Sequence, residues 1–390
     1  MIGVFVLQGW NLILLIPVAL FLQALIDRKY PAMLAFVVFV IGLQVLDGAG
    51  YQHRLYQFGV PDAVYSGMNG WGHFLTPALY YGAYWTCFAA MLGIGAHLFW
   101  RRGLDDADRL RFSEARARLG KGALAGLGMC AFVMLGFGSW IFYNTNVLNE
   151  YRSTEDAERL QAEYEKRYGK YRALPMPEAV DMDVEVDIYP EERRLESRGT
   201  FVLENVRDAP LEELHLNVAA ALTVNHLEVT RGELVESDPV HGFYRYRFDE
   251  SLRPGERVRL TFDLSWRNRG FVNHGSSTRL IHNGTFVNNA EIMPVPGYDF
   301  SRELGDNNKR RKYGLPPAER LPPFGDPASY GVSQLRASTR SAFHAVLSTS
   351  EDQTAIAPGY LRKQWIANGR RYFEYAMDRP IWPFVSFMSA

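Results

Sequence analysis

Nine histidines provide imidazoles that could bind a metal or carry a proton, but their spacing does not form a metal site. The sequence contains no HExxH, so no helix presents two imidazoles and a glutamate base on one face. His274 and His282 lie eight residues apart in a segment typical of strand and loop, and we interpret both as surface residues. We therefore expect this chain to contribute no metal ligand.

Other catalytic patterns are missing as well. Neither GxSxG nor GxxxxGK[ST] occurs, which excludes a serine-hydrolase nucleophile elbow and a P-loop ATP site. Both cysteines, Cys87 and Cys130, lie in apolar runs, where a thiol behaves as a small hydrophobe. Asp47 is the one acid at bilayer depth, which makes it a functional candidate, although it also suits an ordinary helix end. We expect no catalytic residue in the chain.

The chain divides into an apolar and a charged part, which the whole-chain averages conceal. Its net charge of -1 provides no basic face for nucleic acid. A membrane-spanning helix needs about 20 mostly apolar residues. Four stretches in the first 145 residues meet this need to different degrees: Val4–Ile26, Ala32–Leu46, Phe74–Trp100 and Ala123–Tyr143. The first is not a typical signal peptide, since its basic residues follow the apolar run.

The loops between these stretches predict an orientation in the bilayer. Cytoplasmic loops are enriched in Lys and Arg, and the loops around residues 28–29 and 101–121 are the basic ones. We therefore expect a multi-pass protein of the inner membrane with its N-terminus and residues 150–390 outside the cytoplasm. The segment Leu104–Leu119 predicts an amphipathic helix. It suits either a cytoplasmic helix near anionic headgroups or a docking helix for an ATPase subunit.

The remaining residues predict a helical connector followed by β structure. Asn149–Tyr171 has mixed charges with a thin apolar stripe, which favours a charged helix that continues the fourth span as a stalk. From Met182 apolar and acidic residues alternate, which indicates a half-buried strand. Similar runs and turns follow, including a tight turn at Arg253–Glu256 between expected antiparallel neighbours. The further strand-like runs are Thr200–Asn205, Leu214–Val218, Leu222–Val229, Phe243–Phe248, Val258–Trp266, Ala342–Ser348 and Arg371–Met377.

These patterns predict a membrane α-helical bundle of about four spans followed by an all-β antiparallel sandwich or saddle. The expected parts are a transmembrane region at 1–148, the stalk at 149–177 and the β domain at 178–390. Arg302–Pro327 is basic and rich in proline, and we expect it to cross the surface as a long excursion. The aromatic, uncharged segment Ile381–Met388 is unlike a free terminus, so we expect a further domain to pack on it.

Five short segments, spread over nearly the whole chain, point to one architecture. They are NGWGHF (69–74), YNTNVLN (143–149), VDIYP (186–190), FVNNAEIMP (286–294) and the stretch from STS to PGY (348–360). Together they resemble bacterial membrane proteins that fuse an ABC-exporter-like permease to an extracytoplasmic domain of the aminopeptidase N family. The resemblance implies a β saddle that packs against a thermolysin-like zinc domain, which would follow this chain. Zinc is therefore expected in that missing domain and not here.

The same resemblance assigns substrate contacts. In the family a polar pair on the saddle helps to hold the free amine of a peptide substrate. Asn289 and Glu291 occupy the nearest positions here, and the family more often has Gln at the first. Glu291 could also satisfy a strand edge.

Three functions follow from these observations. The leading one is a membrane-anchored, aminopeptidase-like protein that is non-catalytic alone. Its partners would be the lipid bilayer, a downstream zinc peptidase domain and a peptide. The alternative is an ABC-type permease subunit whose outer β domain binds substrate or a partner, together with an ATPase subunit. A structural scaffold is the third.

Overall fold

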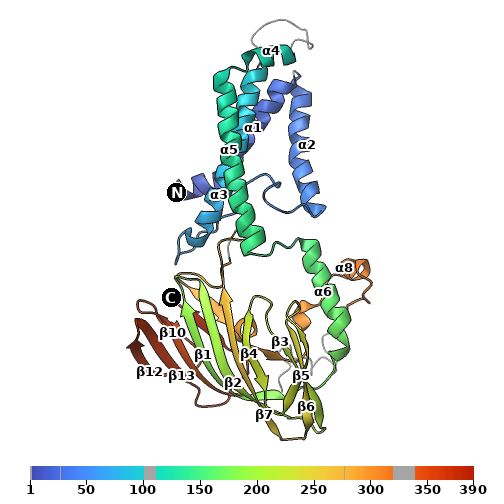
Figure 1. The fold of residues 1–390 in the computed structure, drawn as a ribbon, viewed down its shortest axis with the longest axis vertical. Helices are drawn as coiled ribbons and strands as arrows, with labels where there is room; N and C mark the ends of the chain where they lie inside the picture. Colours follow the sequence, from blue (N-terminus) through green and yellow to red (C-terminus); the bar gives the residue numbers. More distant parts are fainter. Residues whose placement is uncertain (1, 27, 101–110, 276, 319–338) are drawn as a thin grey trace, which may run out of the picture. The chain divides into compact units, whose positions relative to one another are not determined.

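The computed structural model describes residues 2–26, 28–100, 111–275, 277–318 and 339–390 (Figure 1). They form two compact units. Unit 1 comprises Met1–Glu155 and Arg269–Ser277, and unit 2 comprises Asp156–Asn268 and Thr278–Ala390. The short segment Arg269–Ser277 therefore belongs to the helical unit, although the residues on either side of it belong to the β unit.

Unit 1 is helical (Figure 1). Its helices are α1 (Ile2–Leu25), α2 (Lys29–Gly48), α3 (Gly72–Phe99), α4 (Arg111–Arg118), α5 (Lys121–Phe142) and a π-helical turn at Tyr143–Leu148. Helix α1 packs against α2 and α3, and α3 packs against α5. Glycine allows α1 and α3 to approach closely, because a Cβ at Gly82 would lie 2.5 Å from the Trp10 ring. The Trp10 indole N–H also donates to Thr86 Oγ1 at 3.0 Å.

Three helices among the described residues are long and apolar enough to cross a membrane. They are Lys29–Gly48, Gly72–Phe99 and the continuous stretch Lys121–Leu148. The described apolar part of α1, Gly9–Leu25, is shorter. Three of the four predicted spans therefore have the length and composition that a span requires.

The basic loop after α3 forms a helix over its described part. Of the amphipathic helix predicted at Leu104–Leu119, residues 111–118 form α4, and residues 104–110 lie outside the described residues. Arg118 Nη1 donates to the carbonyls of Leu98 at 3.2 Å and Trp100 at 2.7 Å. These carbonyls lie at the C-terminal end of α3, where a cation interacts favourably with the helix dipole.

The charged helix predicted at Asn149–Tyr171 is α6 (Thr154–Tyr168), followed by a 3-10 turn at Gly169–Tyr171. It is not a continuation of α5, because the chain is extended at Asn149 and α6 begins anew at Thr154. Its apolar stripe is buried within unit 2: Tyr164 and Tyr168 cluster with Phe243 and Tyr298. Packing on the β unit therefore accounts for the apolar stripe of this helix.

Unit 2 contains three sheets, whose strands are mostly antiparallel. The seven-stranded sheet has the order β12-β13-β10-β1-β2-β7-β4, the four-stranded sheet β5-β6-β3-β9 and the three-stranded sheet β11-β14-β8. Only β1 and β10 pair in parallel among the described strands. The strands are β1 (Glu178–Tyr189), β2 (Arg194–Glu204), β3 (Leu211–Asn217), β4 (Thr223–Val229), β5 (Gly232–Asp238), β6 (Phe243–Leu252), β7 (Arg257–Arg267), β8 (Thr285–Asn288), β9 (Val295–Pro296), β10 (Ala342–Ser350), β11 (Ala355–Ile356), β12 (Tyr360–Ala367), β13 (Arg370–Ala376) and β14 (Ser386–Ser389).

The core of unit 2 follows the predicted alternation. In β1 the apolar residues Met182, Val184, Val186 and Ile188 are buried, and they join one core cluster with residues of all three sheets. The predicted turn at Arg253–Glu256 also forms, with the Glu256 N–H donating to the Arg253 carbonyl at 3.0 Å. The strands it joins are not paired neighbours, however. Strand β6 pairs with β3 and β5, whereas β7 pairs with β2 and β4 of another sheet.

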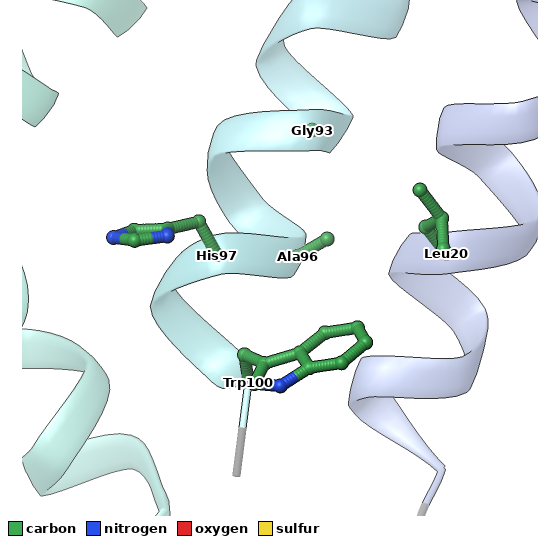
Figure 2. Close-up of a pocket in the computed structure, with 5 residues that line it drawn as sticks. All are labelled: Leu20, Gly93, Ala96, His97 and Trp100. Atoms are coloured by element: carbon green, nitrogen blue, oxygen red, sulfur yellow. The ribbon is translucent and has the colours of Figure 1, made fainter. Parts of the chain in front are cut away.

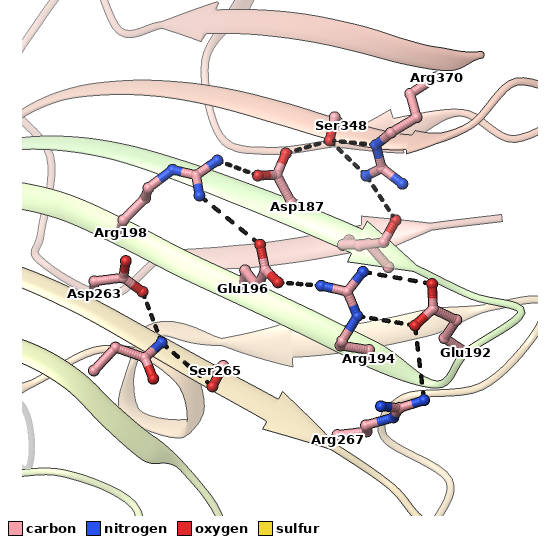
Figure 3. Close-up of polar contacts among 12 residues, drawn as sticks. Asp187, Glu192, Arg194, Glu196, Arg198, Asp263, Ser265, Arg267, Ser348 and Arg370 are labelled. Carbon is pink, nitrogen blue, oxygen red and sulfur yellow. Dashed lines mark hydrogen bonds and ion pairs between the residues drawn. The ribbon is translucent and has the colours of Figure 1, made fainter. Parts of the chain in front are cut away.

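The other face of the seven-stranded sheet carries a network of ion pairs (Figure 3). Arg194 of β2 pairs with Glu192 at 3.1 Å and with Glu196, and Arg198 pairs with Asp187. The Arg194 guanidinium lies over the Tyr189 ring, with its Cζ 3.5 Å from the centroid of the ring. Charges that satisfy one another in this way suit a solvated sheet face.

The predicted excursion at Arg302–Pro327 is described as far as residue 318. It contains α8 (Asn307–Lys312), which holds the basic run. This run is not simply solvated, because Arg310 is buried and forms a bidentate pair with Glu165 of α6, with Nη1–Oε2 2.9 Å and Nη2–Oε1 2.5 Å. The excursion is thereby held against α6.

Candidate functional site

The three-stranded sheet carries a row of exposed apolar side chains. Ile356 of β11 is the register partner of Met388 in β14, and Met388 is the partner of Phe286 in β8. Residues that are direct partners share one face of a sheet. Their exposed fractions are 49%, 46% and 42%, respectively. We call Phe286, Met388 and Ile356 the apolar row.

The opposite face of this sheet is buried, so the side chains of the apolar row point away from the core. Val287 and Phe387 alternate with the exposed residues and belong to the main core. Ser389 is buried too, and its hydroxyl lies 2.7 Å from Thr349 Oγ1 and 2.7 Å from Gln353 Oε1. Because a strand alternates its side chains between two faces, the row must face away from the core.

Asn289 begins α7 (Asn289–Ile292) directly after β8 and holds the C-terminal segment in place. Its Nδ2 donates to the Pro383 carbonyl at 3.0 Å, and its Oδ1 accepts from the Val385 N–H at 3.3 Å. Between these two contacts lies Phe384, whose side chain is 53% exposed. The amide of Asn289 therefore presents an exposed aromatic ring beside the three-stranded sheet.

Glu291 is engaged by its own surroundings. Its Oε2 accepts from the Asn288 N–H at 3.0 Å, which caps α7, and its Oε1 lies 3.1 Å from Arg279 Nε. Arg279 is half-exposed. Both carboxylate oxygens of Glu291 are engaged by groups of the chain itself. The structure thus places Asn289 and Glu291 together in α7, and the side chain of each makes contacts with nearby residues of the chain.

The described residues contain no group of three or more His, Cys, Asp or Glu side chains that could hold a metal ion. His274 and His282 are both exposed, as predicted. His282 Nδ1 lies 2.9 Å from Glu191 Oε1. Cys87 and Cys130 are free thiols within the helices, and Asp47 is exposed at the end of α2.

Unit 1 contains a buried polar cluster that sequence reasoning did not identify. His53 is almost fully buried, and its Nε2 lies 2.9 Å from Asn146 Oδ1 and 3.1 Å from Thr145 Oγ1. Its Nδ1 accepts from the Leu55 N–H at 3.1 Å, so Nε2 carries the proton in the neutral ring. Burial lowers the pKa of His53 below its ordinary value. The feature of the sequence that could have indicated this cluster is the asparagine-rich segment 143–149, whose polar residues follow an apolar stretch.

Hydrogen bonds of asparagine side chains also hold the segment Arg269–Ser277 within unit 1. Asn149 Nδ2 donates to the carbonyls of Arg269 at 2.9 Å and Phe271 at 3.2 Å. Asn273 accepts from the Arg54 N–H at 2.9 Å. Phe271 is buried in one cluster with Tyr81 of α3 and Ile141 of α5. These hydrogen bonds of Asn149 and Asn273 are made within the chain itself, so they serve the structure of unit 1.

A hollow of about 450 Å³ lies between α1 and α3 (Figure 2). It is lined by Leu20, Gly93, Ala96, His97 and Trp100. His97 lies in the last turn of α3, and its ring points away from Leu20 (Figure 2). The remaining lining is largely apolar and offers no group for acid–base chemistry.

Comparison with known proteins gives a distant structural likeness. No family model matches the sequence, and no curated protein sequence matches it either. An M1 zinc metallopeptidase from Deinococcus radiodurans is similar over 55% of this chain and 42% of its own, with a TM-score of 0.33 and 14% identity. A mutant of that enzyme bound to a Tyr-Ser-Ala substrate gives a TM-score of 0.33 and 14% identity, with coverage of 54% and 42%. The chain thus spans less than half the length of these structures, and the comparisons give no support for the expected permease likeness.

Proposed function

We propose that this chain is a membrane-anchored, aminopeptidase-like protein whose β unit binds and does not cleave by itself. The observation that carries the proposal is the apolar row, which lies on a sheet whose other face is fully packed. Contiguous exposed apolar surface marks interaction sites in soluble domains. Phe384, held by Asn289, adds an exposed ring beside this sheet.

We propose a zinc peptidase domain of the aminopeptidase family as the partner that covers the row. The sequence segments that resemble this family support the choice, and so does the position of Asn289 and Glu291 next to the row. In such an assembly the zinc and the water-activating groups belong to the partner domain. Glu291 would meet the free amine of a peptide by exchanging Arg279 for the ammonium group, since both are cations that a carboxylate can hold.

The membrane arrangement is part of the same proposal. We propose that α1 is a fourth span beside the three helices of sufficient length, because it extends over 24 residues, none of which is charged. The basic loops, at residues 28–29 and 101–121, would lie in the cytoplasm. Unit 2 would then lie outside the cytoplasm of a cell with an inner membrane.

The docking test uses the full chain in nanodiscs and a separately purified zinc peptidase domain of the M1 family. Phe286→Ser with Met388→Ser should abolish binding, measured by biolayer interferometry. The matched control is Leu234→Ser with Val240→Ser, which removes two apolar side chains of similar exposure elsewhere in unit 2. Binding that is equal in the row variant and the control, or no binding by the unmodified chain, would refute the proposed docking.

The amine contact needs a separate measurement. With the zinc domain fused after Ala390, Glu291→Gln should raise KM for a peptide with a free N-terminal amine. It should leave the binding of the N-acetylated peptide unchanged. The glutamine retains an oxygen for the cap of α7, so folding is preserved. An unchanged KM for the free-amine peptide would assign Glu291 to the helix cap alone.

A further inference from the structure

Strand β12 lies at the edge of the seven-stranded sheet. Its strand pairing is with β13, and no other strand of the described chain pairs with it. A bulge at Arg362 interrupts the register between Leu361 and Lys363. An edge strand of eight residues leaves a series of backbone N–H and C=O groups directed away from the sheet, where another strand can pair with them.

The side chains of β12 extend beyond the core. Leu361 is the register partner of Tyr375, and both face the same side as Phe373. Phe373 and Tyr375 are buried, whereas Leu361 and Ile366 are 49% and 59% exposed. The core therefore ends at β13. An additional strand alongside β12 would cover apolar side chains that are now in solvent.

The charge at this edge is positive. Arg362 and Lys363 are exposed, and each lies over an aromatic ring of its own strand, at 5.6 Å from Tyr360 and 4.9 Å from Trp365. Neither takes part in an ion pair within the part of the chain that the structure describes. Two further arginines lie in β13, whose sequence contains one acid, Glu374.

These charges distinguish between the two kinds of strand that could pair with β12. A second copy of this chain, pairing antiparallel through the same edge in the register centred on residues 362–363, would bring Arg362 and Lys363 of both copies together. Like charges opposite one another destabilise a sheet. An acidic strand meets no such penalty, because its carboxylates face the unpaired cations.

We propose that β12 binds an extended acidic segment of a partner protein by strand addition. Backbone pairing with the free edge would supply the affinity. Carboxylates near Arg362 and Lys363 would supply the selectivity, and alternating apolar side chains would cover Leu361 and Ile366. This surface is separate from the apolar row, and neither proposal depends on the other.

The experiment uses the full chain in nanodiscs of zwitterionic lipid and a fluorescent, N-acetylated peptide of alternating valine and glutamate. We expect Arg362→Glu with Lys363→Glu to weaken binding by at least about tenfold, as measured by fluorescence anisotropy. The same variant should gain affinity for the peptide in which lysine replaces glutamate. The control, Arg253→Glu with Arg259→Glu, changes the net charge equally at exposed positions away from the β12 edge. It should bind as the unmodified chain does.

A backbone-modified peptide separates strand addition from simple charge attraction. N-methylation of alternate residues keeps all charges but removes the N–H groups that pair with an edge strand. This peptide should bind at least about tenfold more weakly than its parent. Equal binding of the two peptides would overturn strand addition. Equal losses in the β12 variant and the control variant would overturn the assignment to β12.

Discussion

The ion pair between Arg310 and Glu165 provides a sharp test of how unit 2 is held together. Their side chains are 3% and 9% exposed. Besides its two bonds to Glu165, Arg310 donates to the carbonyls of Leu304 at 2.8 Å and Pro316 at 2.6 Å. Replacing Arg310 with methionine fills the space of the side chain but leaves the carboxylate of Glu165 buried without a counter-charge.

The expected loss follows from this geometry. Removing one partner of a buried pair costs about 3–5 kcal/mol, because the remaining charge is desolvated and unpaired. For a unit of this size, about 1 kcal/mol corresponds to a shift in Tm of ~2–4 °C. We therefore expect Arg310→Met to lower the Tm of unit 2 by ~6–20 °C. The double variant Arg310→Met with Glu165→Met should recover most of this loss, since no charge then remains buried.

The assay is thermal unfolding of the full chain in detergent, combined with hydrogen exchange of the α6 amides. Lys309→Met is the matched control, since Lys309 is the preceding residue of α8 and pairs with Glu158 while 47% exposed. Lys309→Met should lower the free energy of unfolding by less than about 1 kcal/mol. If Arg310→Met proved as mild as this control, or if the double variant were less stable than Arg310→Met alone, the reasoning on the buried pair would be wrong.

Three further predictions concern the pH dependence of stability, the segment 269–277 and the membrane topology. Burial lowers the pKa of His215 from its ordinary 6.5, so the unfolded chain takes up a proton first as the pH falls. The stability of unit 2 to urea should therefore decline below about pH 6.5, and less so in His215→Gln. Asn149→Ala removes the side-chain bonds to residues 269–277, which should cost about 1–3 kcal/mol and speed hydrogen exchange of that segment; unchanged exchange would contradict it. In intact cells an impermeant thiol reagent should label Ser237→Cys but not Ser113→Cys, and the reverse pattern would invert the topology.

The local patterns of the sequence predicted several elements well. The alternation from Met182 to Ile188 led directly to β1 and to its buried face. The turn at Arg253–Glu256 was recognised from its residues, but turn chemistry is local and does not reveal that the chain passes to another sheet there. Strand β12 was missed because both of its faces are exposed, so no alternation of polar and apolar residues marks it.

The candidate site shows the same division. Family-like segments led to Asn289 and Glu291, and the structure places both at one corner. The apolar row could not be predicted, because Phe286, Ile356 and Met388 come from three separate parts of the chain. Only strand pairing brings them together. The contacts made by the side chains of Asn289 and Glu291 could not be predicted from the sequence either, since they depend on the positions of residues 279 and 383–385.

Residues 269–277 join the helical unit late in biosynthesis. The chain passes from one unit to the other at three places, after residues 155, 268 and 277. Phe271 therefore joins Tyr81 of α3 and Ile141 of α5 only after all of the first seven β-strands have been made. At a synthesis rate of about 5–20 residues per second, the helices must wait on the order of ten seconds for this part of their own core. If synthesis stopped before residue 271, the cluster of Tyr81 and Ile141 would lack its third buried member.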